Sequence, residues 1–167
     1  LLYKFSLWPL LVKCARHGGR HMTRDVLVRI SGLQAVDGDT NDVEIITTGD
    51  YFLKNGKHYV IYEEMMEGFE GNVRNTVKIT PDVMDIRKQG IIGAHMTFEL
   101  NKKNETRYAT PLGDFVVEIS TNRIRIEEKE DSLKVFVEYS LGINYQHVSD
   151  NSIVMDICSR EKAELRL

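Results

Sequence analysis

Apolar residues recur at every second position along most of this 167-residue chain. The clearest case is residues 133–141, whose odd positions hold Leu133, Val135, Val137, Tyr139 and Leu141. Side chains of a β-strand point alternately to its two faces, so this period predicts strands with one buried face. Almost nothing recurs at helical spacing. The pattern therefore predicts an all-β protein.

The alternating segments are short, and polar turns separate them, which predicts about ten strands. One turn is Asn55-Gly56, a pair that accepts the positive φ angles of a tight hairpin. Asn122 breaks another alternating run, and Gly49 interrupts residues 43–53, where we expect a bulge or sharp bend. Short connections make consecutive strands neighbours, so we expect an antiparallel meander.

The apolar face of such a meander must be buried. Closing the sheet into a barrel buries that face inside and removes both free edges. We therefore predict a single antiparallel meander barrel of about 8–10 strands. A two-sheet sandwich is the alternative. It would need longer crossover connections, and only residues 143–151 look long enough for one.

The first 21 residues differ from the rest of the chain. They are apolar and basic, contain no acid, and hold the only tryptophan, Trp8. Pro9 breaks their apolar run, and no small-residue cleavage site follows, which fits a secretory signal poorly. We interpret residues 1–21 as a translated leader or cloning scar before Met22, residues 22–159 as the barrel domain, and residues 160–167 as a frayed tail that could form a helical turn.

Composition narrows the function. The chain carries 22 basic and 25 acidic residues, and no stretch is apolar enough to span a bilayer. The absence of a basic patch argues against a nucleic-acid partner, and we expect no membrane partner. Cys14 and Cys158 lack metal-ligand spacing and fit a reducing, cytoplasmic setting.

No catalytic arrangement is recognisable in the sequence. There is no glycine-rich phosphate loop and no nucleophile elbow. His58, His95 and His147 are not spaced as metal ligands on one element. We therefore predict no catalytic residues and no metal site, lean away from an enzyme, and leave any cofactor unassigned.

Several polar residues share the inward, apolar phase of their strands. His58, Tyr62 and Glu64 are in phase with Val60, and others follow the same rule: Tyr108, Thr121 and Tyr139. Buried polar groups need partners, because an unpaired one costs roughly 1–3 kcal/mol. Arg87 is the expected cationic partner of Glu63 or Glu64. These residues indicate either a ligand cavity with convergent polar groups or a polar network that fills a solid barrel. The residue types alone favour the network.

Ordered short motifs carry a family resemblance. They are Tyr62-Glu63-Glu64, Arg87 with Gly90, Met96-Thr97-Phe98, Tyr108-Ala109-Thr110-Pro111-Leu112-Gly113, Thr121, and Tyr139 before Leu141. In order and spacing, residues 22 to about 159 resemble the YwiB-like family, small bacterial proteins of uncharacterised function. The resemblance implies a closed or nearly closed calycin-type, lipocalin-like barrel and, by fold analogy, a ligand cup. The Gly-x-Trp signature of true lipocalins is absent from the domain.

We therefore expect a calycin-like barrel that binds a small, partly apolar ligand in its interior. The expected contact residues are Tyr62, Glu64, Arg87, Met96, Tyr108, Thr110 and Tyr139. The alternative is a solid-core barrel that acts as a protein-interaction or oligomerisation module. In that case the outer face or residues 65–72 would bind a partner or a second copy of the chain.

Overall fold

The fold is described by a computed structural model for residues 11–14, 22–36 and 39–166. Ten strands form one antiparallel sheet: β2 Asp25–Val36, β3 Asp39–Lys54, β4 Lys57–Met65, β5 Asn72–Thr80, β6 Val83–Gly90, β7 Ala94–Glu99, β8 Lys103–Thr110, β9 Gly113–Lys129, β10 Ser132–Ile143 and β11 Gln146–Ser159. A separate pair joins β1 Leu11–Cys14 to β12 Ala163–Arg166, and the 3-10 turn η1 Arg160–Lys162 precedes β12. The predicted all-β architecture is confirmed.

The terminal segments bear on the predicted domain boundaries. η1 is a helical turn where one was expected, and β12 then extends the tail as a strand. The interpretation of residues 1–21 as a leader falls, apart from Leu11–Cys14, on residues outside the described ranges, and it stays a prediction.

The sheet nearly closes on itself. The strand order is β7-β6-β5-β4-β3-β2-β11-β10-β9-β8, so the first strand of the domain, β2, pairs with the last, β11. β7 and β8 are the two ends of the sheet, and one pair joins them there. Gly93 and Ala109 exchange backbone hydrogen bonds of 3.0 and 2.8 Å. The structure is thus a nearly closed barrel of ten meandering strands, as predicted.

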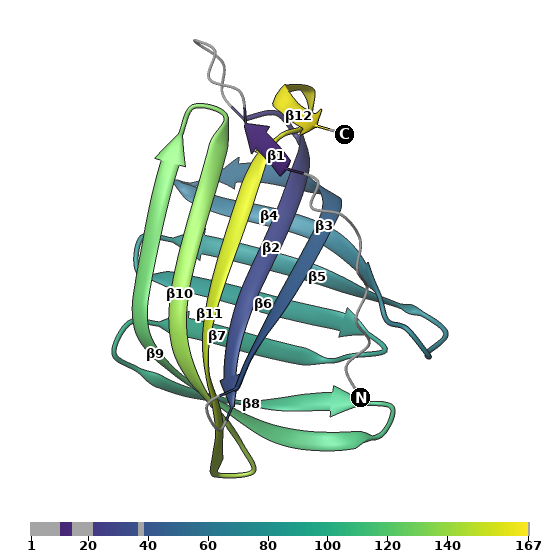
Figure 1. Ribbon diagram of the computed structural model, residues 1–167, viewed down its shortest axis with the longest axis vertical. Coiled ribbons are helices and arrows are strands. Elements are labelled where there is room, and N and C mark those ends of the chain that lie inside the picture. Colours follow the sequence, from purple (N-terminus) through teal and green to yellow (C-terminus); the bar gives the residue numbers. More distant parts are fainter. Residues whose placement is uncertain (1–10, 15–21, 37–38, 167) are drawn as a thin grey trace.

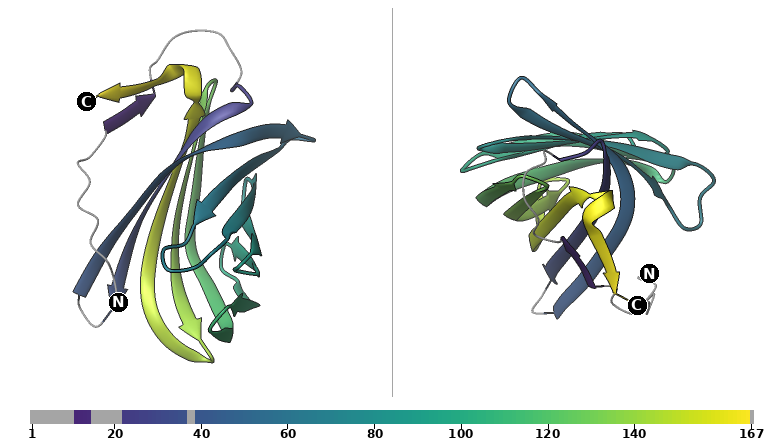
Figure 2. Two further views of the ribbon diagram at one scale, coloured as in Figure 1. Left: turned by 90° about the vertical axis from the view of Figure 1, so that its right-hand side faces the viewer. Right: turned by 90° about the horizontal axis from the view of Figure 1, so that it is seen from above.

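The barrel is flattened into two layers whose strands cross at a steep angle (Figures 1 and 2). The front layer holds β10, β11, β2 and much of β3 and β9, and the back layer holds β4 to β8 (Figure 1). β3 and β9 belong to both layers. β3 pairs with β2 as far as Asp50 and with β4 from Gly49 onward. β9 pairs with β8 from Gly113 to Ser120 and with β10 from Val117 onward.

Each of these two long strands has a local feature at its corner. At Gly49 an added Cβ would lie 2.7 Å from the carbonyl oxygen of Ile61, so no larger residue fits there. In β9 the register with β10 shifts by one residue, which leaves Asn122 as a bulge. Bends and bulges are the usual way for a strand to pass between crossed layers.

Two hairpin turns decide the topology. Asn55 and Gly56 have φ angles of 52° and 70°, which confirms the predicted tight turn. Residues 143–151, the only candidate for a crossover, instead form a second hairpin, with φ angles of 49° at Asn144 and 67° at Tyr145. Because β10 and β11 are direct neighbours, the sandwich alternative is wrong.

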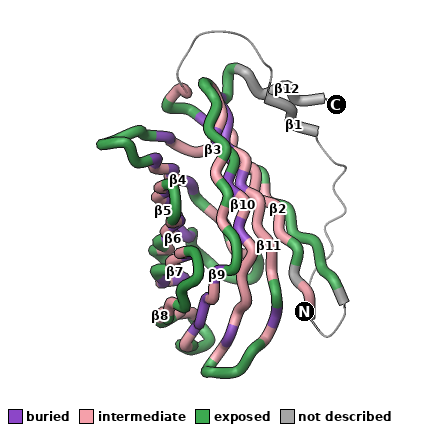
Figure 3. The backbone as a smooth tube through the Cα atoms, turned by 90° about the vertical axis from the view of Figure 1, so that its left-hand side faces the viewer, coloured by how far each residue is buried: buried purple, intermediate pink, exposed green. Residues whose placement is uncertain are grey.

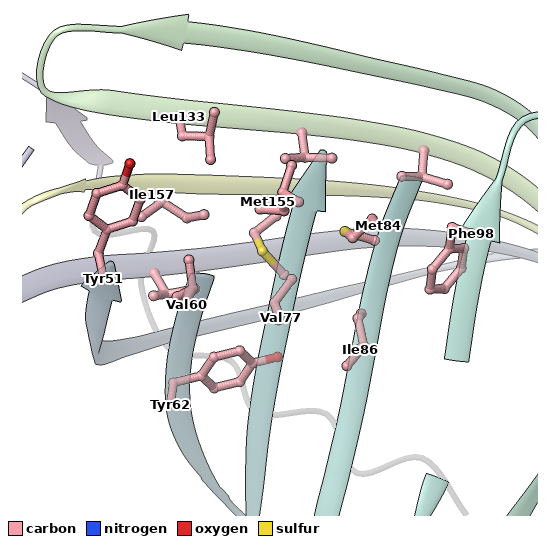
Figure 4. Packing of buried hydrophobic residues seen from close by; sticks show 14 of the residues in the cluster. Tyr51, Val60, Tyr62, Val77, Met84, Ile86, Phe98, Leu133, Met155 and Ile157 are labelled. Atoms are coloured by element: carbon pink, nitrogen blue, oxygen red, sulfur yellow. The ribbon is translucent and has the colours of Figure 1, made fainter. Parts of the chain in front are cut away.

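Apolar side chains fill the space between the layers in one half of the barrel. Val60, Val77 and Met84 from the back layer face Leu133, Met155 and Ile157 from the front layer (Figure 4). Each of these side chains is fully or almost fully buried. Burial of one such side chain contributes roughly 1.5–3 kcal/mol. We call this region the packed half.

Burial falls toward the end of β2 and the start of β3 (Figure 3). Residues 40–44 of β3 are exposed, and Ile30 and Gly32 of β2 are half-buried. The back layer does not follow β3 here, because β4 pairs with β3 only from Gly49 onward. We call this region, where β3 and β4 separate, the open end.

Candidate functional site

Three polar side chains bind one another on the inner face of the back layer. Lys88 Nζ lies 3.0 Å from Glu64 Oε2 and donates to Asn75 Oδ1 at 2.8 Å. Asn75 Nδ2 also donates to Glu64 Oε2, at 3.1 Å. Asn75 is fully buried, and 25% of the Glu64 side chain and 15% of the Lys88 side chain remain exposed. We call Glu64, Asn75 and Lys88 the Glu64 cluster.

Strand alternation explains why these three residues meet. Glu64 follows Val60 and Tyr62 on β4, Asn75 lies between Val73 and Val77 on β5, and Lys88 follows Met84 and Ile86 on β6, all in the buried phase of their strands. Asn75 pairs with Lys88 across β5 and β6. Tyr62 is the last β4 residue that pairs with β3, so the Glu64 cluster begins where the open end begins.

Three tyrosines on the inward phase have raised pKa values and stay neutral. Burial raises the pKa of Tyr62 above its usual range, and the nearby Glu64 carboxylate adds to the shift. The same two causes, in the same order, raise the pKa of Tyr108. Burial raises the pKa of Tyr139 to about 12.

The hydroxyls of Tyr62, Tyr108 and Tyr139 make no hydrogen bond to any described residue. A neutral phenol can both donate and accept. Tyr139 is also held by its ring, which packs edge-on against Phe98 with 5.0 Å between centroids. The three side chains thus offer hydroxyls without a described protein partner, two of them within the electrostatic reach of Glu64.

The structure places the other predicted site residues differently. Met96 packs against the core, and Thr110 Oγ1 is used within the β8–β9 turn, where it donates to the carbonyl of Gly113 at 2.8 Å. Arg87 is exposed and lies on the outer face, because its neighbours Ile86 and Lys88 occupy the inner phase. The prediction that Arg87 pairs with Glu63 or Glu64 is wrong, because Lys88 is the partner of Glu64 and Arg74 is the partner of Glu63.

Sequence reasoning missed Asn75 and Lys88. A signal for both was present, since each continues the two-residue period of buried neighbours on its strand. The prediction of Arg87 rests on its charge and its place near the strand end, whereas the phase of the strand points to the next residue. Tyr62, Glu64, Tyr108 and Tyr139 lie on the inner side as predicted.

An apolar groove of about 280 Å³ lies at the open end. Its lining comes from β2, β3, β10 and β11 and consists of Ile30, Gly32, Leu33, Val43, Ile45, Tyr139, Leu141, Asn151, Ser152 and Ile153. Tyr139 belongs both to this groove and to the set of tyrosines without a hydroxyl partner. The groove therefore offers an apolar wall with a polar atom on it.

The opposite end of the barrel has a different polar arrangement. The Tyr51 hydroxyl lies 2.8 Å from Nδ1 of buried His58, and His58 Nε2 lies 3.6 Å from the Glu128 carboxylate. Tyr51 and Glu128 also line a pocket of about 530 Å³ with Met22 and Leu53. The tyrosine hydroxyl at this end is satisfied, unlike those near the Glu64 cluster.

Within the described ranges, no three or more His, Cys, Asp or Glu side chains are grouped as a metal site would require. Over the same ranges, no helix has the length and apolar character needed to cross a membrane.

These features define a class: a nearly closed, ten-stranded antiparallel barrel with a filled half, an open end and inward polar side chains at that end. The chain belongs to the family described as a domain of unknown function, DUF1934, which matches residues 28–155. It is 24% identical over 122 residues to the uncharacterised β-barrel protein YwiB of Bacillus subtilis strain 168, covering 72% of this chain and 84% of YwiB. The crystal structure of the Bacillus subtilis ywiB protein superposes with a TM-score of 0.74 at 18% identity, covering 81% of this chain and 92% of that one.

Proposed function

We propose that this protein is a cytoplasmic, calycin-like binding module that holds a small, partly apolar ligand at the open end of the barrel. The apolar part of the ligand lies along the groove, against Ile30, Val43 and Ile45. Its polar part hydrogen-bonds to the tyrosine hydroxyls near the Glu64 cluster. The observation that carries the proposal is the absence, within the described chain, of any protein partner for those hydroxyls.

The polar chemistry favours a neutral or weakly polar head group. Glu64 and Lys88 already neutralise each other, so the Glu64 cluster itself offers little net charge to an ion. These hydroxyls keep some contact with solvent, because none of them is a fully buried atom. A ligand that supplies both donors and acceptors would replace that solvent, and a typical hydrogen bond contributes about 0.5–1.5 kcal/mol.

The size of the groove limits the ligand. Pockets for drug-sized molecules have volumes of about 300–1,000 Å³. At about 280 Å³ the groove lies at the small end of this range. The packed half leaves the ligand no route through the barrel, so it must bind at the mouth and remain partly exposed.

The test uses the neutral fluorescent probe N-phenyl-1-naphthylamine and a variant that fills the groove. Gly32 lines the groove, and a Cβ there would meet only the carbonyl oxygen of Ser152, at an ordinary 3.6 Å. Gly32→Phe therefore occupies the groove without forcing the backbone. Ser31→Phe is the control, because its side chain points to the opposite face.

We expect the unmodified protein and Ser31→Phe to enhance probe fluorescence with similar affinity, and Gly32→Phe to bind roughly tenfold more weakly, about 1.4 kcal/mol. Thermal melts check that both variants are folded. Equal probe affinity in the two variants, or no enhancement by the unmodified protein, would contradict the proposal.

Protein interaction is a second candidate function. It is favoured by the end of β4 and the loop that follows it, where Met65 is 82% exposed and Phe69 is 38% exposed. Sedimentation velocity over a hundredfold concentration range tests for a second copy as the partner. A monomer throughout that range would exclude self-association through this loop.

A further inference from the structure

Half of β3 has an edge with which no described strand pairs. β3 pairs with β2 from Asp39 to Asp50, but with β4 only from Gly49 to Lys54. No described strand pairs with the other side of residues 40–48. β3 and β4 diverge here, and β3 continues beside β2 away from the back layer (Figure 2, left view).

The hydrogen-bond pattern shows which residues face this edge. The Tyr51 N–H donates to the Arg24 carbonyl at 2.7 Å, so odd-numbered residues of β3 turn their backbone groups toward β2. Neither ladder of β3 contains a register shift, so the alternation holds along the strand. The even-numbered residues therefore present N–H and C=O groups to the free edge: Thr40, Asp42, Glu44, Ile46 and Thr48.

This edge carries acidic side chains but lacks the other usual protection. Natural edge strands are commonly blunted by charged side chains, above all lysine, by proline or by a bulge. Residues 39–48 contain neither lysine nor proline, and no bulge interrupts their pairing with β2. The inward side chains along the edge are apolar, since Val43 and Ile45 line the groove, and Ile46 is exposed on the outer face.

Both sides of the opening are acidic. Residues 39–48 of β3 contain three acids and no base, and residues 63–72, which end β4 and begin β5, contain four acids and no base. Glu44, Glu63 and Glu64 are matched by cations from other segments: Arg29, Arg74 and Lys88. Asp42, Glu67 and Glu70 make no ion pair within the described chain.

We propose that an extended peptide segment of a partner protein adds to β3 as a further strand, with basic residues on its outer face and apolar residues toward the groove. The free backbone groups supply the hydrogen bonds, and Val43 and Ile45 supply the apolar contact, as in other complexes formed by strand addition. The acidic opening selects lysine or arginine. A second copy of this chain would bring the same acidic edge and meet like charge.

This inference goes beyond the small-ligand proposal because it depends on the backbone of β3. The probe is a blocked seven-residue peptide of alternating lysine and valine, titrated by calorimetry into the full chain. One control peptide carries N-methyl groups on the amides of alternate residues, which removes the strand hydrogen bonds and leaves the charge unchanged. A second control replaces every lysine with glutamate.

On the protein side, Ile46→Pro removes an N–H from the free edge and obstructs the approaching strand, while the ladder with β2 is untouched. Ile46→Ala is the matched control, because it shortens the same side chain and keeps the N–H. We expect the peptide to bind Ile46→Pro about tenfold more weakly than Ile46→Ala, which corresponds to about 1.4 kcal/mol. Both control peptides should bind the unmodified protein at least tenfold more weakly than the parent peptide does.

Two results would overturn the inference. If the N-methylated peptide binds the unmodified protein as well as its parent, the contact is charge attraction alone. If Ile46→Pro and Ile46→Ala bind equally, the edge is not used. N-phenyl-1-naphthylamine binding should be the same in both Ile46 variants, so a failure of strand addition remains distinct from a failure of the small-ligand site.

Discussion

The two halves of the barrel follow the same alternating sequence pattern but have different structures. In the packed half, inward residues of the front layer, such as Leu133 and Ile157, meet inward residues of the back layer, such as Val60. At the open end, Ile45 and Val43 also point inward, but no back-layer strand lies opposite them along β3. An inward phase therefore buries a side chain only where the second layer is present.

The polar residues differ in the same way. In the packed half, the Tyr51 hydroxyl is satisfied by His58 at 2.8 Å. Near the open end, the Tyr62 hydroxyl has no described protein partner, although the residue is buried. The satisfied pair is typical of a polar contact that stabilises the fold, and the unsatisfied hydroxyls are what a binding site would use.

The largest expected effect comes from shortening one apolar side chain in each half. Leu133→Ala should lower the free energy of unfolding by about 3 kcal/mol, because the cavity it leaves is closed on all sides. Ile45→Ala, at the half-buried groove, should cost less than about 1 kcal/mol. Urea denaturation measures both. Equal losses would show that the groove is as tightly packed as the core.

High pH should destabilise the protein through its buried tyrosines. The folded pKa of Tyr139 is about 12, above the unfolded value of 10.0, so the unfolded state loses its proton first as the pH rises. The contribution of neutral Tyr139 to the free energy of unfolding is fully present below pH 10 and is lost between pH 10 and 12. The loss is roughly 2–3 kcal/mol, at about 1.4 kcal/mol per pKa unit.

The measurement is the free energy of unfolding as a function of pH for the unmodified protein and for Tyr139→Phe. The free energy of unfolding of the variant should decline less steeply with pH, because position 139 then has no phenol to ionise. Tyr62 and Tyr108 still contribute to the decline. Superimposable curves would mean that Tyr139 is not buried in the folded state.

Lys88 and Arg87 provide a matched pair on the two faces of β6. Lys88→Met should cost about 1–3 kcal/mol, because Glu64 loses its cation inside the barrel. Arg87→Met, on the exposed face, should change stability by less than about 0.5 kcal/mol. Adding Glu64→Leu to Lys88→Met should recover most of the loss. Greater destabilisation by Arg87→Met would restore the original assignment of Arg87.

The smallest effects should come from removing tyrosine hydroxyls at neutral pH. Tyr62→Phe should change stability by less than about 0.5 kcal/mol, since no protein hydrogen bond is lost. Tyr51→Phe should cost about 1 kcal/mol, because His58 Nδ1 loses its partner. Thermal and urea denaturation together resolve the difference. A large loss for Tyr62→Phe would indicate a structural role for that hydroxyl.

Much of the fold could be predicted because the period of two is a local property of each strand. The alternation located the strands, and the interruptions at Gly49 and Asn122 marked the two corners. The sequence did not show that β3 and β9 run continuously through those corners, because that depends on pairing with neighbours on both sides. It also could not show that β4 leaves β3 at Gly49, which creates the open end.

The candidate site was predicted in part for a similar reason. Tyr62, Glu64, Tyr108 and Tyr139 were found from phase alone. Arg87 was chosen by charge, and the phase set by Met84 and Ile86 would have selected Lys88. The partners of Glu64 depend on the register between β4, β5 and β6, which a single sequence does not fix.

Amide hydrogen exchange along β3, followed by NMR at single residues, tests the open end most directly. If the account is right, the amides of Thr40, Asp42, Glu44, Ile46 and Thr48 exchange at least about a hundredfold faster than those of Val43, Ile45 and Thr47, which are bonded to β2. Uniform protection of residues 40–48 would mean that a strand covers this edge and that the barrel has no open end.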